Sequence, residues 1–290
     1  MRVDSDFRIK PGKKLRLKDI DPAYCGRHKS EGEAGPAIAH YRQKMANLQP
    51  RLYADKTQSV LIVLQALDAA GKDGTVNHVL SALNPQGASV TGFKQPTPEE
   101  LAHDFLWRIH PHTPGKGEIA VFNRSHYEDV LVTRVHKLID KPTWKERYQR
   151  IREFEELLVE NRTCILKFYL HISKEEQLAR FAQRLDDPAR NWKISESDYT
   201  ERAYWDDYIA AFEDAIMATS TKDAPWFVIP ANHKWFRNLA VSQIVAEAME
   251  GLHLNFPKPT VDLAEIRRKY HAAARGDKGA AKSASAKKST

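Results

Sequence analysis

The segment from Ser59 to Val76 constrains the fold of this chain more than any other, and it reads SVLIVLQALDAAGKDGTV. Its apolar run, Val60 to Leu64, is typical of a buried strand, and a helix is expected to open at Gly71 and Lys72 after a turn of small residues. This order predicts a phosphate-binding loop, whose backbone N–H groups hold phosphate while a lysine reaches the transferred group. The alternative is a tight turn with a surface lysine.

The loop departs from the common pattern GxxxxGK[ST] in an informative way. Ala66 occupies the first glycine position, and Asp73 follows the lysine in place of Ser or Thr. Asp68 lies inside the loop, where a negative charge would face the phosphates. A carboxylate is favourable there when a cation lies between it and the phosphates. We therefore expect Asp68 to hold a divalent metal ion.

The net charge of +7 belongs to the C-terminal end of the chain. Residues 267–290 contain eight Lys or Arg and one Asp, so they carry the whole excess, and residues 1–266 are balanced. A polyanion bound by the body of the chain must therefore meet a local basic patch, not a general positive field. The Ala-, Ser-, Gly- and Lys-rich segment 272–290 is predicted to be a disordered basic tail.

The N-terminus does not resemble a signal peptide, and the chain shows no membrane pattern. The N-terminal residues are charged and lack an apolar core, and no apolar run has the length of a membrane span. Cys25 and Cys164, the two cysteines, form neither a disulfide framework nor a metal site. These features predict a cytoplasmic protein with no membrane partner and no specific nucleic-acid partner.

Strands alternate with helices along most of the chain, which predicts a parallel sheet covered by helices on both faces. The expected strands are listed here: Val60–Leu64, Ala88–Phe93, Gly117–Asn123, Thr163–Ile172 and Trp226–Pro230. Helices are expected between them, including one over Pro98–Ile109. The predicted domains are an N-terminal arm with one helix (1–57), a central α/β domain (58–255), a C-terminal segment (256–271) and the tail.

Charged residues follow the third expected strand in the run FNRSHYED, which begins at Phe122. In open α/β sheets, ligands bind beyond the carboxyl ends of the strands. Arg124 can grip a phosphate with two N–H groups, and Glu128 and Asp129 can orient a metal ion or water. The alternative is an ordinary helix start with solvated charges.

Two further basic groups fit a phosphate-binding site. Arg180 and Arg184 share a face of the fourth expected helix, while Arg190 and Lys193 lie in an interrupted segment, about 186–200, that we interpret as a mobile lid. The alternative is a solvated helix face. After the second strand, three residues are candidates for the acceptor nucleotide: Phe93 for the base, and Lys94 and Arg108 for its phosphate.

Five motifs in order resemble the polyphosphate kinase 2 family: ALDAAGKDGT, FKQPTPEEL, LWRIH, FNRSHYEDV and RLDDPARNWK. The resemblance covers about Arg51 to Leu254 and is specific as a set. It implies a three-layer P-loop kinase fold, with five parallel strands in the order 2-3-1-4-5 and a helical lid. It also implies transfer of phosphate between inorganic polyphosphate and nucleotides with Mg²⁺, or Mn²⁺ as a possible substitute.

The resemblance also implies roles for residues. Asp68, Lys72 and Arg124 would be catalytic, and Asp68 and Glu128 would hold the metal ion. The polyphosphate-binding set would be Gly71, Lys72, Asp73, Gly74, Thr75, Arg180, Arg184, Arg190 and Lys193. The nucleotide-binding set would be Phe93, Lys94, Arg108, Asn123, Arg124, Tyr127 and Glu128. A homodimer or homotetramer is expected from the family.

Asn123 stands where many family members have Asp, and a neutral amide is a poorer magnesium ligand than a carboxylate. Asn123 together with Glu128 resembles the subgroup often called class III, which accepts AMP as well as ADP. The alternatives are an ATP-dependent nucleoside monophosphate kinase with the same fold, and a non-catalytic protein that binds RNA or another polyanion. The charge balance of the body and the aspartate in the phosphate loop disfavour the second alternative.

Overall fold

A computed structural model describes residues 6–286 and divides the chain into two units, Met1–Asn255 and Phe256–Thr290. The first unit is built on one parallel sheet in the order β2-β3-β1-β4-β5, which is the order expected for a P-loop kinase. Its strands are β1 (Ser59–Gln65), β2 (Ala88–Gly92), β3 (Ile119–Asn123), β4 (Thr163–His171) and β5 (Trp226–Pro230). The predicted α/β class is confirmed.

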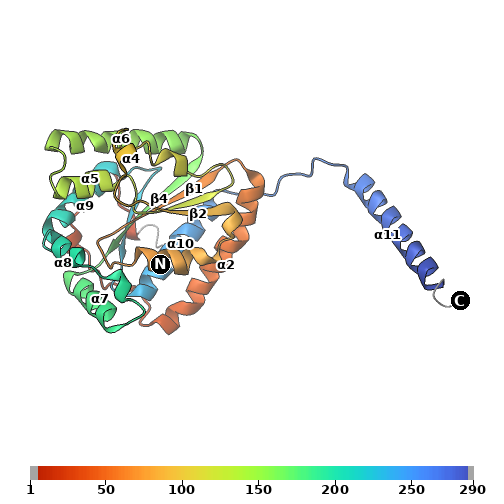
Figure 1. The fold of residues 1–290 in the computed structure, drawn as a ribbon, viewed down its shortest axis with the longest axis horizontal. Coiled ribbons are helices and arrows are strands. Elements are labelled where there is room, and N and C mark those ends of the chain that lie inside the picture. The colour runs from red at the N-terminus through yellow and green to blue at the C-terminus, as the bar shows by residue number, and fades with distance from the viewer. Residues whose placement is uncertain (1–5, 287–290) are drawn as a thin grey trace. The chain divides into compact units, whose positions relative to one another are not determined.

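Helices cover both faces of this sheet (Figure 1). One face carries α5 (Glu128–Val135), α6 (Lys141–Glu160) and α9 (Trp205–Thr219). The other carries α2 (Glu31–Asp55), α3 (Lys72–Val79) and α10 (Lys234–Gly251). The remaining helices are α4 (Pro98–Leu101), α7 (Lys174–Asp186), α8 (Glu196–Arg202) and five 3-10 turns, η1 (Leu17–Asp19), η2 (Leu80–Ala82), η3 (Pro85–Gly87), η4 (His110–His112) and η5 (Asn191–Lys193).

The central strands are buried because the sheet is covered on both sides. Every residue of β1 is buried, which explains its uninterrupted apolar run. By contrast β2 lies at the edge of the sheet, and its residues are at least partly exposed. Since all five strands are parallel, their carboxyl ends meet along one edge, and the loops that follow β1 and β3 lie side by side there.

The N-terminal segment is not a separate polar arm, contrary to the expectation for residues 1–57. Phe7, Leu15 and Leu17 are buried in the core, and the backbone of Ile9 donates to the carbonyl of Trp226 on β5. The helix that follows is α2, which packs on α10. The apolar residues before α2 are few and irregularly spaced, so their pattern does not predict that they are buried in the core.

The expected helix over Pro98–Ile109 is short, because α4 ends at Leu101. Asp104 starts a local turn instead: its side chain accepts from the backbone of Leu106, and its carbonyl accepts from Trp107. Aspartate in this role competes with the helical hydrogen-bond ladder.

The second unit contains α11 (Leu263–Ala286), so the segment expected to be disordered from residue 272 is helical up to Ala286. Its alanines and lysines have high helix propensity, which a composition argument for disorder leaves out. Residues 287–290, the end of the expected tail, lie outside the described residues. No helix in the described part of the chain is both long enough and apolar enough to cross a membrane.

Candidate active site

The loop between β1 and α3 has the backbone of a phosphate-binding loop. Gly71 caps α3 with φ of 109°, a left-handed conformation that glycine adopts without the steric cost of a side chain. Ala69 also has a positive φ, 60°, so the loop turns sharply twice before the helix begins. The N–H groups at the start of α3 and its helix dipole favour an anion at this position.

Lys72 is the first residue of α3, and its ammonium folds back over the loop to donate to the carbonyl of Ala66 at 2.8 Å. Burial lowers the pKa of Lys72, while the nearby Asp68 carboxylate opposes this shift and Arg124 adds to it. Only one of the three ammonium donors has a protein partner among the described residues. A phosphate oxygen bound in the loop would therefore find two open donors and would favour the charged form of the lysine.

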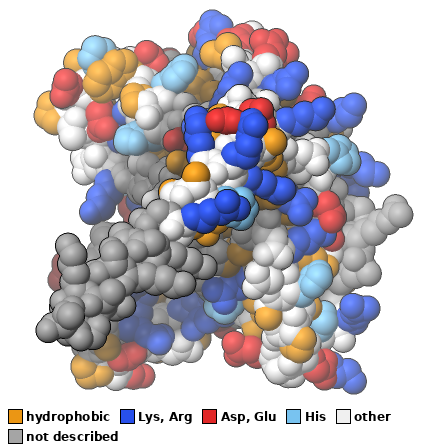
Figure 2. All heavy atoms as spheres, turned by 90° about the vertical axis from the view of Figure 1, so that its right-hand side faces the viewer, with side chains coloured by type: hydrophobic (Ala, Val, Ile, Leu, Met, Phe, Trp, Pro, Cys, Tyr) orange, Lys and Arg blue, Asp and Glu red, His pale blue; other side chains and the backbone are white. Residues whose placement is uncertain are grey.

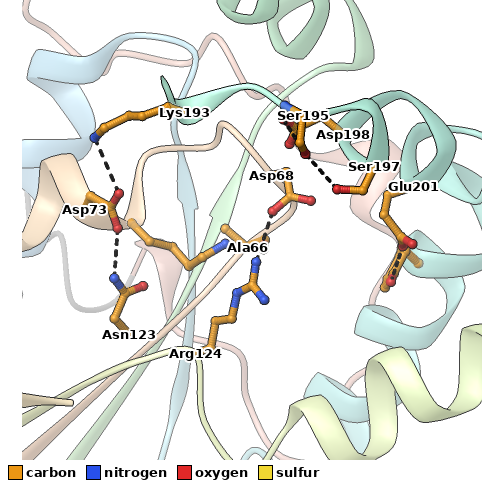
Figure 3. A network of polar contacts seen from close by, with 12 residues as sticks. Ala66, Asp68, Asp73, Asn123, Arg124, Lys193, Ser195, Ser197, Asp198 and Glu201 are labelled. Atoms are coloured by element: carbon orange, nitrogen blue, oxygen red, sulfur yellow. Dashed lines mark hydrogen bonds and ion pairs between the residues drawn. The ribbon is translucent and has the colours of Figure 1, made fainter. Parts of the chain in front are cut away.

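Asp68 and Arg124 join the two neighbouring loops. Arg124 Nη2 lies 3.3 Å from Asp68 Oδ1, and both side chains remain partly exposed (Figure 3). The backbone of Arg124 has φ of 66° and its N–H donates to the carbonyl of Leu64. A left-handed non-glycine residue costs on the order of 1 kcal/mol or more, and such strain concentrates at functional sites. The β3 loop thus aims Arg124 at the phosphate loop.

Glu128 opens α5 beside this pair and is half-buried. Burial raises the pKa of Glu128, and the charges of Arg124 and Lys72 counter the effect. Asp68 and Glu128 are thus two carboxylates that both act on Lys72. In the described part of the chain, no three His, Cys, Asp or Glu side chains are grouped to hold a metal ion by themselves. A Mg²⁺ ion bound by one or two carboxylates plus substrate phosphates fits this set.

Asp73, which replaces the usual Ser or Thr, connects the loop to two other elements (Figure 3). Its Oδ1 accepts from Asn123 Nδ2 at 2.9 Å, and its Oδ2 lies 3.6 Å from Lys193 Nζ. Burial would raise the pKa of Asp73, but the Asn123 amide and the Lys193 charge bring it below its ordinary value. The end of β3 and the expected lid therefore meet at one ionised carboxylate.

Besides Lys72, four basic residues are expected to bind polyphosphate, and they differ in the hydrogen-bond donors that they leave open. Arg180 has no open donor: its guanidinium donates to the carbonyls of Ala69, Ala70, Ala231 and Asn232, and its Nε donates to Glu176. The structure thus contradicts direct polyphosphate binding by Arg180, which instead holds the phosphate loop from α7. The i,i+4 spacing of Arg180 and Arg184 could not show that the first is buried.

The other three lie in and beside the expected lid. Arg184 donates to the carbonyl of Lys193 at 3.2 Å and lies 3.8 Å from Asp198. Arg190 pairs with Asp187 at 2.9 Å and is well exposed. Arg184, Arg190 and Lys193 thus lie close together in the α7–α8 segment. Their binding to polyphosphate stays a prediction.

In the first turn of α3, Gly74 is exposed, but Thr75 is fully buried and its hydroxyl donates to the carbonyl of Gly71 at 3.1 Å. The backbone N–H of Thr75 donates to the same carbonyl, and the expected contact of Thr75 with polyphosphate stays a prediction. The hydroxyl stabilises the first turn of α3.

The expected nucleotide-binding set is also divided. Lys94 is exposed after β2, but Phe93 is buried against Phe122, with ring centroids 5.0 Å apart. Arg108 is buried and donates to the carbonyl of Lys94 at 2.9 Å, with Glu100 at 3.3 Å. Phe93 and Arg108 therefore shape the loop that presents Lys94. Arg108 Nε has no partner among the described residues, and direct contacts of these two side chains with a nucleotide stay a prediction.

Tyr127 is the clearest correction, because its side chain points into the core and is completely buried. Its hydroxyl lies 2.8 Å from Glu155 and 2.9 Å from Thr219, shares its one proton between these two acceptors, and accepts from Lys167 at 3.0 Å. Tyr127 therefore contacts no nucleotide. It anchors the loop that carries Arg124 and Glu128 to a buried ion pair between Lys167 and Glu155.

Two residues behind the phosphate loop were not expected from the sequence. Gln177 on α7 donates to the carbonyl of Asp68 at 3.0 Å. Arg237 on α10 is buried against the loop, and its Nη1 lies 3.5 Å from the carbonyl of Ala70. A signal for Arg237 exists: it is the one charged residue within the apolar run WFRNLAV of the closing helix.

Known proteins of one family resemble this chain in sequence and in fold. A family model described as polyphosphate kinase 2 (PPK2) matches residues 28–257. An AMP/ADP-polyphosphate phosphotransferase of Meiothermus ruber is 48% identical over 254 residues, 87% of this chain and 95% of that protein. An ADP-polyphosphate phosphotransferase of Rhodopseudomonas palustris is 44% identical over 88% of this chain and 92% of that protein. The crystal structure of polyphosphate kinase 2 from Arthrobacter aurescens TC1 superposes with a TM-score of 0.90 at 42% identity, covering 93% of this chain and 96% of that one.

Proposed function

The chain belongs to the polyphosphate kinase 2 family, and from this premise we propose that it transfers phosphate from inorganic polyphosphate to AMP and ADP, reversibly. The observation that carries the proposal is the meeting of three elements at one edge of the sheet. The phosphate loop presents Lys72, the β3 loop presents Arg124, and the α7–α8 segment brings Lys193 to the same loop.

Each group has a role in such a transfer. Phosphoryl transfer needs little covalent chemistry from the protein, because positioning and neutralisation of charge on the phosphate oxygens supply most of the rate. We assign Lys72 to the transferred phosphate, and Arg124 to the junction between donor and acceptor. Lys193, Arg184 and Arg190 hold the donor chain under the lid. The acceptor is a nucleotide phosphate oxygen, which is ionised near neutral pH and needs no general base.

A divalent cation, Mg²⁺ or in its place Mn²⁺, would add positive charge on the phosphate oxygens when it is bound. Asp68 and Glu128 are the residues that would hold it, with phosphate oxygens and water completing its coordination. Asn123 donates its amide to Asp73, so its side chain is directed to the loop carboxylate.

The alternatives predict different chemistry. An ATP-dependent nucleoside monophosphate kinase would share the fold, while an RNA- or polyanion-binding protein would need a broad basic surface. Figure 2 shows acidic side chains among the basic ones on one face. The balance of charge over residues 1–266 disfavours the second alternative. A cytoplasmic location and a homodimer or homotetramer stay proposals.

One assay separates these functions. AMP and ADP are each incubated with long-chain polyphosphate and Mg²⁺ but no ATP, and the products are separated by chromatography. Formation of ADP from AMP and of ATP from ADP supports the proposal. No transfer from polyphosphate, together with phosphorylation of AMP by added ATP, would assign the chain to the first alternative. Binding of polyphosphate or RNA without turnover would assign it to the second.

The class III assignment predicts that Glu128→Ala lowers kcat/KM with AMP far more than with ADP, by roughly tenfold or about 1.4 kcal/mol. The single phosphate of AMP must reach further into the site than the terminal phosphate of ADP, so it depends more on the carboxylate beside Arg124 and Lys72. Parallel kinetics with both nucleotides measure this ratio, with Glu128→Gln as the variant that keeps the side-chain volume. An equal loss on both nucleotides would leave Glu128 the role of a helix N-terminal residue, which stabilises a helix by about 0.3–1 kcal/mol.

Deleting residues 272–290 should leave turnover within about twofold at moderate salt, because none of the proposed site residues lies in that segment and a lysine-rich terminus binds polyanions weakly and with strong salt dependence. Steady-state kinetics of the shortened and the full chain at two salt concentrations test this. A tenfold rise in the KM for polyphosphate at physiological salt would make the basic segment part of the substrate site.

A further inference from the structure

Arg237 occupies a position that the proposed transfer does not yet use. It lies one turn into α10, only 3% exposed, with its guanidinium between the helix and the phosphate loop. Its Nε and Nη2 both donate to the Asn238 side chain, at 3.2 and 2.8 Å. Its Nη1 has one long contact, 3.5 Å to the carbonyl of Ala70. The guanidinium carries five N–H donors, so part of its donor capacity is unused.

Gly71, which caps α3, and Gly74, in its first turn, leave the space that the Arg237 guanidinium fills. A Cβ atom added to Gly71 would lie 1.9 Å from Arg237 Nη1, and one added to Gly74 would lie 3.2 Å from Nη2. A side chain at Gly71 would therefore overlap the Arg237 guanidinium, and one at Gly74 would crowd it. The positive φ of Gly71 is a second reason for glycine at that position.

Arg237 carries a positive charge that is almost completely buried. Within the described residues no carboxylate pairs with it, whereas the neighbouring Arg180 pairs with Glu176 at 2.7 Å. Burial, and then the charge of Arg180, lowers the pKa of Arg237 to about 10. A buried cation without a counter-ion is unfavourable for folding. A phosphate chain bound in the adjoining loop would supply the missing negative charge.

We infer that Arg237 is a positioning residue for the polyphosphate donor: it packs against Gly71 and Gly74 from behind, and the bound phosphate chain balances its charge through the loop. This inference rests on the proposed function, since it concerns the donor that the same loop binds. Under this inference the phosphate loop lies between two cations. Lys72 contacts the phosphate directly, and Arg237, on the side of α10, adds a positive electrostatic potential at the bound phosphate.

The competing hypothesis is that Arg237 has only a structural role, and it predicts different results for stability and for polyphosphate binding. If Arg237 only fills space, its replacement lowers the stability of the ligand-free protein and leaves the affinity for polyphosphate unchanged. If its charge serves the donor, replacement by a neutral polar residue removes an unfavourable buried charge in the absence of ligand and weakens polyphosphate binding. The ligand-free stability and the donor affinity therefore change in different ways under the two hypotheses.

The test compares Arg237→Gln, Arg237→Lys and, as a control for loss of one arginine, Arg150→Gln on the exposed side of α6. For Arg237→Gln we expect the KM for polyphosphate to rise at least about tenfold, the KM for ADP to change by less than about threefold, and the ligand-free melting temperature to stay within about 3 °C. Arg237→Lys keeps the charge and should restore the KM for polyphosphate to within about threefold of wild type. Arg150→Gln should match wild type throughout.

Binding is also measured without turnover, as the rise in melting temperature on adding tripolyphosphate, so that a failure of the transfer assay does not decide this test. The rise should be large in wild type and Arg237→Lys and much smaller in Arg237→Gln. An unchanged KM and thermal shift in Arg237→Gln, or an equal loss on both substrates, overturns the inference. If Arg237→Gln does not fold, Arg237→Lys decides: a KM near wild type supports the role of charge, and a tenfold rise in a folded protein refutes it.

Discussion

Lys72→Ala is expected to lower kcat at least about a hundredfold while the protein stays folded. Removing a charge-assisted contact made at transfer costs on the order of 3 kcal/mol, and each 1.36 kcal/mol corresponds to a factor of ten in rate. Among the described residues the one hydrogen bond of the Lys72 ammonium is to the carbonyl of Ala66, and Arg124 still lies beside Asp68 when Lys72 is removed, so the fold should survive the change. Single-turnover kinetics with saturating polyphosphate and ADP measure the chemical step directly.

Lys145→Ala is the matched control, since Lys145 is an exposed lysine on α6 and lies outside the proposed site. Circular dichroism and the melting temperature establish that Lys72→Ala is folded. A folded Lys72→Ala variant that keeps half of the wild-type turnover would contradict the assignment of the β1–α3 loop as the phosphate-binding loop.

The largest expected effect on stability belongs to Glu155→Ala. Glu155 pairs with Lys167, and both side chains are almost completely buried. Lys167, together with His126, offsets the effect of burial and holds the pKa of Glu155 below its ordinary value. Removing one partner of a buried pair leaves an uncompensated charge and costs about 3–5 kcal/mol. Denaturant unfolding followed by fluorescence should show a loss of this size in the free energy of unfolding.

The double variant Glu155→Leu with Lys167→Met sharpens the test, because replacing both charges by apolar groups of similar volume is often neutral or stabilising. It should therefore be more stable than Glu155→Ala. Glu153→Ala, at an exposed site two positions earlier on α6, should leave the unfolding midpoint unchanged. Since Tyr127 ties the Arg124 loop to this pair, Glu155→Ala should also lower kcat. A wild-type free energy of unfolding in Glu155→Ala would refute the assigned role of the pair.

The sheet could be predicted from the sequence because its strands are short, apolar and separated by clear helix starts. The buried run of β1 and the glycine at position 71 place the phosphate loop at the carboxyl edge without any structural knowledge. The strand order, in contrast, follows from the family resemblance, since hydrophobic patterns do not specify which strands pair. The structure confirms it.

The site could be predicted only in part, because a sequence names polar side chains but does not show which way they point. In the run after β3, the left-handed backbone of Arg124 turns the chain, so Arg124 lies in the site while Tyr127 enters the core. A helical spacing likewise puts Arg180 and Arg184 on one face. Arg180, however, packs against the phosphate loop, and all of its N–H donors bond to the protein. Such outcomes depend on packing between segments far apart in the chain.

The contact between Asp73 and Lys193 should change how polyphosphate binding depends on salt concentration. Before any substrate binds, this lid lysine already has an anionic partner, so a polyphosphate chain that reaches it exchanges one anion for another. An exchange of this kind releases fewer counterions than the number of basic side chains at the site would suggest, and the affinity should fall less steeply with salt. The aspartate that replaces the usual hydroxyl residue would then make donor binding less sensitive to ionic strength, at the expense of some affinity.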